Sequence, residues 1–214
     1  MCIRDSININ KPAGWTSFDV VKKVRGIINE KKVGHAGTLD PFATGVLILG
    51  TGTDTKKLSS IALSNKSYIA DLTLGIETDT HDCDGKITSK EKIPDLSQEM
   101  VENVLSTFIG NNKQTPPMFS AKKINGVRLY KLARQNKVVK RDPVEINIYQ
   151  IHLLKFTLPT ITFEVTCSKG TYIRVLGLDI AKKLGTTGYL SSLKRISVGS
   201  YNITDSKLIE EISS

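Results

Sequence analysis

The sequence predicts an α+β fold, with a mixed, largely antiparallel central sheet and flanking helices. Residues 68–74 and 160–168 alternate apolar and polar side chains with a period of two, which is typical of half-buried strands. Residues 17–28 and 97–108 instead repeat apolar side chains at helical spacing. These segments do not follow one another in the regular βαβ rhythm that predicts a parallel sheet.

The chain is expected to begin with a strand and an amphipathic helix. Residues 7–10 indicate a short strand that runs into the turn KPAG at residues 11–14. Ser17 is of a type that favours the N-cap position, and we expect it to start the first helix. The apolar face of that helix is expected to carry Val20, Val21, Val24, Ile27 and Ile28.

Short elements are expected from there to residue 90. Residues 34–45 are irregular and rich in glycine, and the apolar run 46–49 indicates a buried strand. Residues 55–63 predict a short helix. The alternating strand at 68–74 precedes a polar turn at 79–85, after which another short strand is expected.

The second half of the chain continues the same mixture. We expect Ser97 to cap a helix whose apolar face carries Met100, Val101, Val104, Leu105 and Phe108. Residues 144–156 and 160–168 predict two strands. Gly170 leads into a helix through Ile173, Leu176, Ile180 and Leu184. Residues 193–201 predict the last strand, and a short C-terminal helix follows it.

The basic residues are unevenly distributed. The chain carries 30 lysines and arginines against 21 acidic residues, a net charge of +9. The whole excess lies between residues 113 and 141, which hold no acidic residue and nine basic ones: Lys113, Lys122, Lys123, Arg128, Lys131, Arg134, Lys137, Lys140 and Arg141. This favours an anionic partner, with nucleic acid first; a lysine-rich proteome or a solvated loop is the alternative.

The basic residues belong to a segment that interrupts the core pattern. Residues 114–142 open with Pro116-Pro117 and close with Asp142-Pro143, and residues 129–135 predict a helix inside them. We interpret this segment as an insert that leaves the core and returns to it.

Cysteine content and hydropathy exclude several classes of protein. Cys2, Cys83 and Cys167 form no C-x-x-C pair, which favours a reducing cytoplasm over a disulfide framework or a zinc site. No apolar run approaches the roughly 20 residues that a membrane span needs, and residues 1–6 lack the apolar stretch of a secretory signal. We therefore expect a cytoplasmic protein without a membrane segment or a metal.

The loop GHAGTLDPFATG at residues 34–45 has the strongest chemical character. Its glycines and alanines give the backbone little side-chain cover, so another polymer can approach closely. Pro41 disfavours the helical region for Asp40, which fixes one carboxylate on a thin loop. The alternative is a structural aspartate that caps a turn.

Four blocks of the sequence resemble TruB-type pseudouridine synthases. They occur in the order and at the spacing of that family: NKPAGWTS at residues 10–17, GHAGTLDP at 34–41, KSY at 66–68 and CSKGTYIR at 167–174. The resemblance covers about residues 7–212. It implies a pseudouridine synthase-like catalytic domain over residues 7–214, with 114–142 as an inserted tRNA-binding thumb. The further C-terminal RNA-binding domain of many relatives is expected to be absent or truncated.

The resemblance also implies an activity. Such enzymes isomerise a uridine in the T-loop of tRNA, position 55 by convention, to pseudouridine, after the base has left the stack. The reaction needs no metal and no other cofactor. The implied partner is tRNA, bound through its T-arm, and we expect a monomer.

Three residues match the catalytic residues of the family. Asp40 matches the nucleophile. Tyr68 matches a tyrosine that stacks on the uracil and helps to remove the proton from C5; a core aromatic is the alternative. Arg174 matches an arginine that pairs with the nucleophile and keeps it ionised and oriented; a surface arginine is the alternative.

Four further residues match positions around the substrate. His35 matches a histidine that fills or braces the space of the flipped base, and a turn histidine bonded to backbone is the alternative. Tyr172 and Leu193 match residues that line the uracil pocket. Lys11 is expected to support the site or to contact a phosphate.

Weaker signals and rival functions stay open at this point. Residues 50–57 lack P-loop spacing, the acidic residues of 79–85 lack the closing glutamate of a calcium loop, and Trp15 is expected to be a packing residue. The rivals are a catalytically idle RNA-binding protein on the same fold, a synthase that acts on another RNA, and a phosphate-binding transferase.

Overall fold

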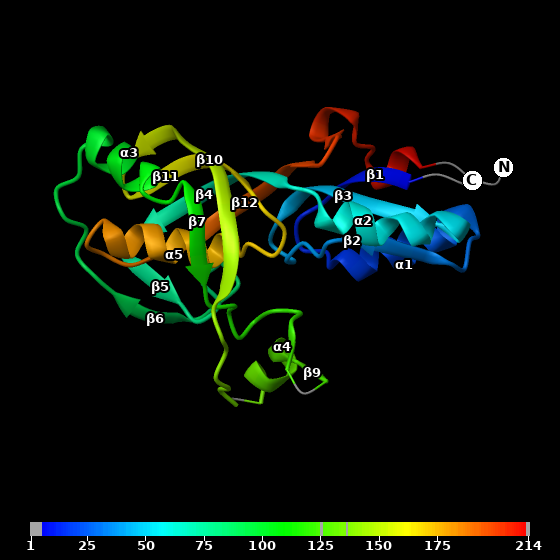
Figure 1. The fold of residues 1–214 in the computed structure, drawn as a ribbon, viewed down its shortest axis with the longest axis horizontal. Helices are drawn as coiled ribbons and strands as arrows, with labels where there is room; N and C mark the ends of the chain where they lie inside the picture. The colour runs from blue at the N-terminus through cyan, green and yellow to red at the C-terminus, as the bar shows by residue number, and fades with distance from the viewer. Residues whose placement is uncertain (1–5, 125, 136, 213–214) are drawn as a thin grey trace. The chain divides into compact units, whose positions relative to one another are not determined.

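The computed structural model describes residues 6–124, 126–135 and 137–212. The chain divides into two compact units, one of Met1–Ile69 with Leu193–Ser214 and one of Ala70–Ser192. Strands β4 (Lys66–Leu74) and β12 (Gly188–Val198) contain the two boundaries between these units. Figure 1 labels the elements of both units.

The sheet of the first unit is mixed. Its strands other than β12 are β1 (Ser6–Lys11), β2 (Val33–Ala36), β3 (Thr44–Thr51) and β13 (Tyr201–Asn202). Strand β3 pairs antiparallel with β1 and β2 and parallel with β12, and β13 pairs antiparallel with β12. The predicted buried strand at 46–49 is confirmed, since all four residues are fully buried in β3. Residues 34–36 were expected to be irregular but extend in β2, because β3 offers them a pairing edge.

Helix α1 (Ser17–Ile28) already includes Ser17 as its first residue, so the predicted Ser17 N-cap is wrong by one residue. Thr16 is the N-cap: its Oγ1 accepts from the Asp19 amide at 3.1 Å, and the Asp19 carboxylate accepts from the Thr16 amide at 2.9 Å. This reciprocal capping box satisfies two amides at the helix end. Hydrogen bonds from Thr16 also lower the pKa of Asp19. Ser17 is therefore free to turn its side chain inward.

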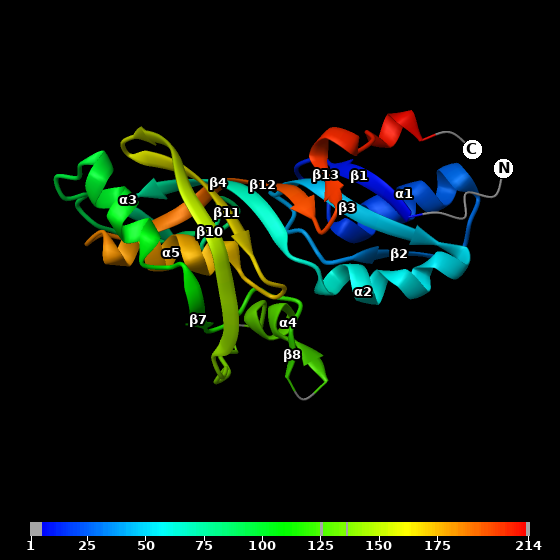
Figure 2. The same ribbon diagram turned by 45° about the horizontal axis from the view of Figure 1, so that its top comes forward.

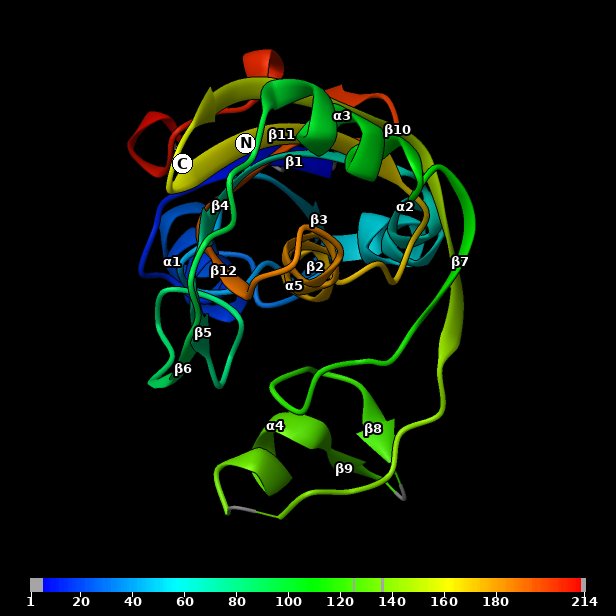
Figure 3. The ribbon, with the colours of Figure 1, turned by 90° about the vertical axis from the view of Figure 1, so that its left-hand side faces the viewer.

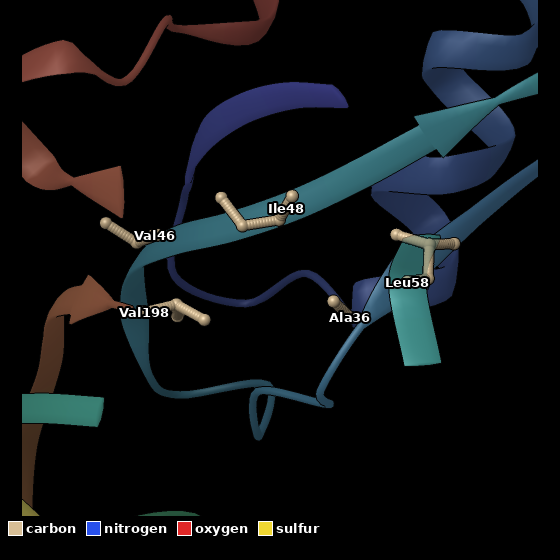
Figure 4. Close-up of a cluster of buried hydrophobic side chains, with 5 residues drawn as sticks. All are labelled: Ala36, Val46, Ile48, Leu58 and Val198. Carbon is tan, nitrogen blue, oxygen red and sulfur yellow. The ribbon is translucent and has the colours of Figure 1, made fainter. Parts of the chain in front are cut away.

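A cluster of small and branched side chains forms a core within the first unit (Figure 4). It consists of Ala36, Val46, Ile48, Leu58 and Val198. Leu58 opens α2 (Leu58–Leu63), and the 3₁₀ helix η1 (Gly52–Lys57) precedes it. The helix predicted over 55–63 thus consists of a 3₁₀ segment and a short α-helix.

The second unit contains the rest of the sheet, in the order β12-β4-β11-β10-β7. The strands not yet given are β7 (Gly110–Gln114), β10 (Val144–Thr157) and β11 (Thr160–Cys167). Strand β10 pairs antiparallel with β7 on one side and with β11 on the other. The alternation predicted for β4 is confirmed, because Tyr68, Ala70, Leu72 and Leu74 are buried and the residues between them are partly exposed. Figure 2 shows the long β10 beside β11.

Two helices accompany these strands. In Figure 3, α5 (Ile173–Lys183) is seen end-on inside the curve of the strands. Helix α3 (Gln98–Ser106) packs against β10 and α5, and Ser97 caps it as predicted, accepting from the Met100 amide at 3.2 Å. Met100 does not join the apolar face as expected, because it follows the cap in the first turn and points to solvent, 48% exposed.

The insert leaves the sheet at the end of β7 and returns at the start of β10. It contains β8 (Lys123–Ile124), β9 (Val127–Arg128) and α4 (Leu129–Ala133), and Figures 1 to 3 all show it as a separate lobe of the second unit. Leu129 and the pair Pro116-Pro117 are the buried apolar residues at the start and middle of the insert. The predicted helix starts at residue 129 as expected and ends two residues early, at Ala133.

The remaining elements are short. Strands β5 (Ile76–Thr78) and β6 (Ile87–Lys90) form a hairpin around the predicted polar turn. The expected C-terminal helix is present as two 3₁₀ helices, η2 (Ile203–Asp205) and η3 (Ile209–Glu211). Within the described ranges, no helix is both long and apolar enough to cross a membrane.

The cluster of Figure 4 gives a test of the first unit. We expect Ile48→Ala to destabilise the protein by about 2–5 kcal/mol, because it leaves a cavity at a fully buried position, and Ile48→Val by about 0.5–1.5 kcal/mol. Urea unfolding at neutral pH measures both. Equal effects of the two variants would contradict a close-packed cluster.

Candidate active site

Asp40 lies in the loop of residues 37–43, between β2 and β3 in the first unit. The Pro41 carbonyl accepts from the Gly14 amide at 2.9 Å, and the Ala43 amide donates to the Asp40 carbonyl at 3.1 Å. The loop therefore rests on the KPAG turn and closes on itself around the half-buried Asp40.

Lys11 supports this loop from inside the first unit. Its side chain is fully buried, and its ammonium donates to the carbonyls of Pro12 (2.8 Å), Trp15 (2.6 Å) and Pro41 (3.1 Å). These contacts agree with support of the site, and the role of Lys11 stays a prediction.

Ser17 fixes the other side of Asp40. Its Oγ accepts from the Leu39 amide at 2.9 Å and lies 3.2 Å from the Leu39 carbonyl, to which it donates. Both residues are buried. The two chain neighbours of Asp40, Leu39 and Pro41, are thus each held by the segment of residues 11–17, so the main chain at Asp40 is fixed on both sides.

The first unit also contains three other predicted site residues. His35 is half-buried on β2, where it pairs with Leu49 of β3. Tyr68 on β4 is 8% exposed, and Leu193 on β12 is 6% exposed. The burial of Tyr68 agrees with a core aromatic as well as with a pocket wall, so its role stays a prediction.

Arg174 belongs to the first turn of α5 in the second unit and is 3% exposed, which excludes a surface arginine. Its guanidinium donates to the Thr80 carbonyl (2.7 Å) and the Phe119 carbonyl (2.8 Å). One nitrogen also lies 3.4 Å from a carboxylate oxygen of Asp82. Arg174 thereby joins α5 to the β5–β6 turn and to the first leg of the insert. Its predicted pairing with Asp40 stays a prediction.

Asp82 was considered only as one of the acids of the polar turn and not as a partner of a site residue. It is 5% exposed, its Oδ1 accepts from the Thr80 hydroxyl and from the Asp84 amide, and its Oδ2 faces Arg174. Burial lowers the pKa of the adjacent His81. One acid of the turn, Asp82, serves an ion pair, and no local pattern indicated it because Arg174 lies far along the chain.

Gln114 was also missed as a site residue. It is 3% exposed at the end of β7, where its side chain accepts from the Tyr172 amide (2.7 Å) and donates to the Tyr172 carbonyl (3.0 Å). Tyr172 is the N-cap of α5 and offers no side-chain cap of its own. Gln114 therefore fixes the backbone from which Tyr172 and Arg174 project, at the root of the insert.

The first unit offers the carboxylate of Asp40 and the phenol of Tyr68, and a carboxylate and a phenol are groups that can serve in nucleophilic attack and proton transfer. The second unit offers the guanidinium of Arg174. In the part of the chain that the structure describes, no group of three or more His, Cys, Asp or Glu residues is placed to hold a metal ion.

Residues 25–173 match the model of the TruB family pseudouridylate synthase N-terminal domain. The chain belongs to this family. The predicted family and enzyme class are confirmed, and a phosphate-binding transferase is excluded.

Curated relatives agree with the family. The chain is 47% identical to a tRNA pseudouridine synthase B of Clostridium kluyveri, over 97% of this chain and 72% of the relative. It is 46% identical to a tRNA pseudouridine synthase B of Dehalococcoides mccartyi, over 94% of this chain and 67% of the relative. It is 48% identical to a tRNA pseudouridine synthase B of Protochlamydia amoebophila, over 90% of this chain and 73% of the relative.

Solved structures confirm the fold class. A chain of a Cbf5-Nop10-Gar1 complex is 28% identical with a TM-score of 0.73, over 92% of this chain and 49% of that one. A chain of an H/ACA RNP has the same TM-score at 24% identity, over 96% and 51%. This chain spans about half the length of these solved chains.

The Arg174–Asp82 pair gives a test of the second unit. Asp82→Asn keeps the shape of the turn but removes the charge opposite a buried guanidinium, and we expect a loss of stability of about 3–5 kcal/mol. Asp84→Asn, an exposed neighbour in the same turn, is the control and should change little. Urea unfolding decides, and equal effects would show that the pair is not a buried one.

Proposed function

We propose that this chain isomerises a uridine in the T-loop of tRNA, at position 55, to pseudouridine, with Asp40 as the nucleophile. The observation that carries the proposal is the fixing of Asp40: Leu39 is held by Ser17, and Pro41 by Lys11 and Gly14. A single carboxylate on a thin, anchored loop suits attack on a base that has left its stack. The names of the curated relatives support tRNA as the substrate.

The reaction needs no partner beyond RNA and water. The bond from the ribose to N1 of the base breaks and a bond from the ribose to C5 forms. The proton on C5 leaves to a base, N1 gains a proton, and any bond that Asp40 has formed to the substrate is broken again. Substrate and product are isomers, so no oxidant or group donor is required. In this proposal Tyr68 stacks on the uracil and helps to remove the proton, while His35, Tyr172 and Leu193 bound the base.

Arg174 suits the role of an oriented donor toward Asp40. Two of its five N–H groups are fixed by the carbonyls of Thr80 and Phe119, which hold the guanidinium plane. Asp82 offsets the cost of burying its charge. A guanidinium held in this way can fix the plane of a carboxylate, which an ammonium cannot.

The insert suits the role of a grip on the tRNA backbone. Most of its basic side chains are exposed: Lys123, Arg128, Lys131, Arg134, Lys137 and Lys140. Arg134 lies over the ring of Tyr130 at 5.6 Å, and Arg141 ties the two legs by donating to the Pro116 carbonyl at 3.1 Å. An exposed basic lobe of this kind presents charge to phosphates. We further propose that the T-arm is the part that is gripped, and that the protein acts as a monomer in the cytoplasm.

Asp40→Asn tests the proposed nucleophile. We expect pseudouridine formation to fall by more than about 10²-fold, since the amide keeps the shape but is a far poorer nucleophile. Binding of tRNA should stay nearly unchanged, because Asp40 is one group among many contacts. Single-turnover assays on unmodified tRNA measure the rate. No product from the unaltered protein, with tRNA binding intact, would instead support the idle RNA-binding protein.

The insert is tested by removing its charge. Replacing five of its basic residues by Gln should weaken tRNA binding and lower the slope of log affinity against log salt by about 0.7–0.9 for each lost phosphate contact. The five are Lys122, Lys123, Arg128, Lys131 and Arg134.

A control variant loses five exposed lysines outside the insert: Lys31, Lys32, Lys56, Lys90 and Lys92. Filter binding across a salt series compares the two variants. Equal slopes would mean that the insert carries charge but no phosphate contacts.

A further inference from the structure

Arg195 is a buried arginine that neither the motifs nor the proposed reaction includes. It lies on β12, two residues after Leu193, and is 1% exposed, one of the largest fully buried side chains of the protein. Its Nε donates to the Val46 carbonyl at 2.7 Å, and its Nη2 donates to the Gly37 carbonyl at 3.2 Å.

These two carbonyls stand at opposite ends of the loop that carries Asp40. Gly37 is the first residue after β2, and Val46 lies just inside β3. One rigid guanidinium therefore joins the two ends of the loop, and Asp40 lies between them. Because the guanidinium is planar and its donors have a fixed geometry, the two ends are held at a set separation.

The glycines of the loop fit around the same residue. Gly45 has φ +102° and pairs in parallel register with Arg195, and a Cβ at Gly45 would overlap the Arg195 carbonyl. Gly37 has φ +82°, and its Cβ would come within 3.6 Å of Nη1 of Arg195. Gly45 thus allows the close approach of β3 to Arg195, whereas a Cβ at Gly37 would meet Arg195 at an ordinary contact distance and Gly37 is required by its positive φ.

The charge of Arg195 lacks an acidic partner. Within the described part of the chain, no ion pair joins Arg195 to a carboxylate, so only neutral carbonyls are shown to accept from it. A buried charge with neutral partners is costly, and an apolar residue would fill the same core space at a lower cost. Such a departure from a low-cost core is expected where a residue serves a functional site.

We propose that Arg195 is a positioning residue for the isomerisation: it fixes both ends of the loop and thereby the place of Asp40. The proposal rests on the proposed function. Arg195 acts through the backbone of Gly37 and Val46 and takes no part in the chemistry.

Two substitutions test the role of Arg195. Arg195→Lys keeps the charge but reaches one carbonyl at a time, and Arg195→Met fills the space with no donor. We expect the single-turnover rate at saturating tRNA to fall by about 10²-fold in Arg195→Lys, the cost of misplacing a reacting group by about 1 Å. Arg195→Met should be slower still. The tRNA dissociation constant should stay unchanged in both, measured at a temperature at which circular dichroism shows them folded.

Arg25→Lys is the matched control. Arg25 lies in the same unit and donates to the Val33 carbonyl at 2.7 Å, but it does not touch the loop. Arg25 is only partly buried, so Arg25→Lys should lose less stability than Arg195→Lys, and it should keep its rate. If Arg195→Lys turned over as fast as Arg25→Lys, Arg195 would be only a structural residue and the proposal would fail. If the unaltered protein formed no pseudouridine, the proposed function would fail first.

If neither Arg195 variant folds, a second pair of variants tests the proposed positioning role. Gly37→Ala keeps Arg195 but strains the loop end that it holds, and Gly110→Ala carries a similar strain at φ +97° in open space of the other unit. We expect Gly37→Ala alone to slow the reaction. Equal rates in the two alanine variants would overturn the proposal.

Discussion

The candidate site depends on hydrogen bonds that buried lysine side chains donate to backbone carbonyls of irregular segments. A glycine-rich loop has few side chains to pack, so its position has to come from hydrogen bonds to its main chain. Lys11 supplies three donors to the turn and loop around Pro41. Lys66, 6% exposed, does the same after α2, donating to the carbonyls of Ala62 and Ser64. A neutral side chain offers fewer donors from one buried atom, which explains why charged residues occupy these places.

Local patterns predicted the regular elements well, because each element leaves its signature in adjacent residues. The alternation in β4 and the apolar run in β3 are examples. The misassigned N-cap of α1 shows the limit of prediction from local patterns. Thr16 and Ser17 are both residue types that favour the N-cap position, but the Ser17 hydroxyl is bonded to Leu39 and Thr16 caps the helix. That contact lies 22 residues away and leaves no local pattern.

The candidate site was predictable only where a motif resembled a known family. Gln114 and Arg195 act through contacts separated by 58 residues and by about 150 residues along the chain, and neither stands in a pattern of its own. The motif pointed to Arg174, but it indicated neither the burial of Arg174 nor its ion pair with Asp82. Side chains that bind distant backbone become visible only when the fold brings the segments together.

The two buried arginines are compensated differently, which separates their roles in the proposed reaction. Arg174 faces Asp82, so much of its charge is offset, and its value lies in the direction of its donors. Arg195 has two neutral carbonyls as its shown acceptors, so its charge is less offset. The value of Arg195 therefore lies in the two ends of the loop that its fixed donors join. A lysine at this position should keep the charge and lose the positioning, because an ammonium fixes no plane.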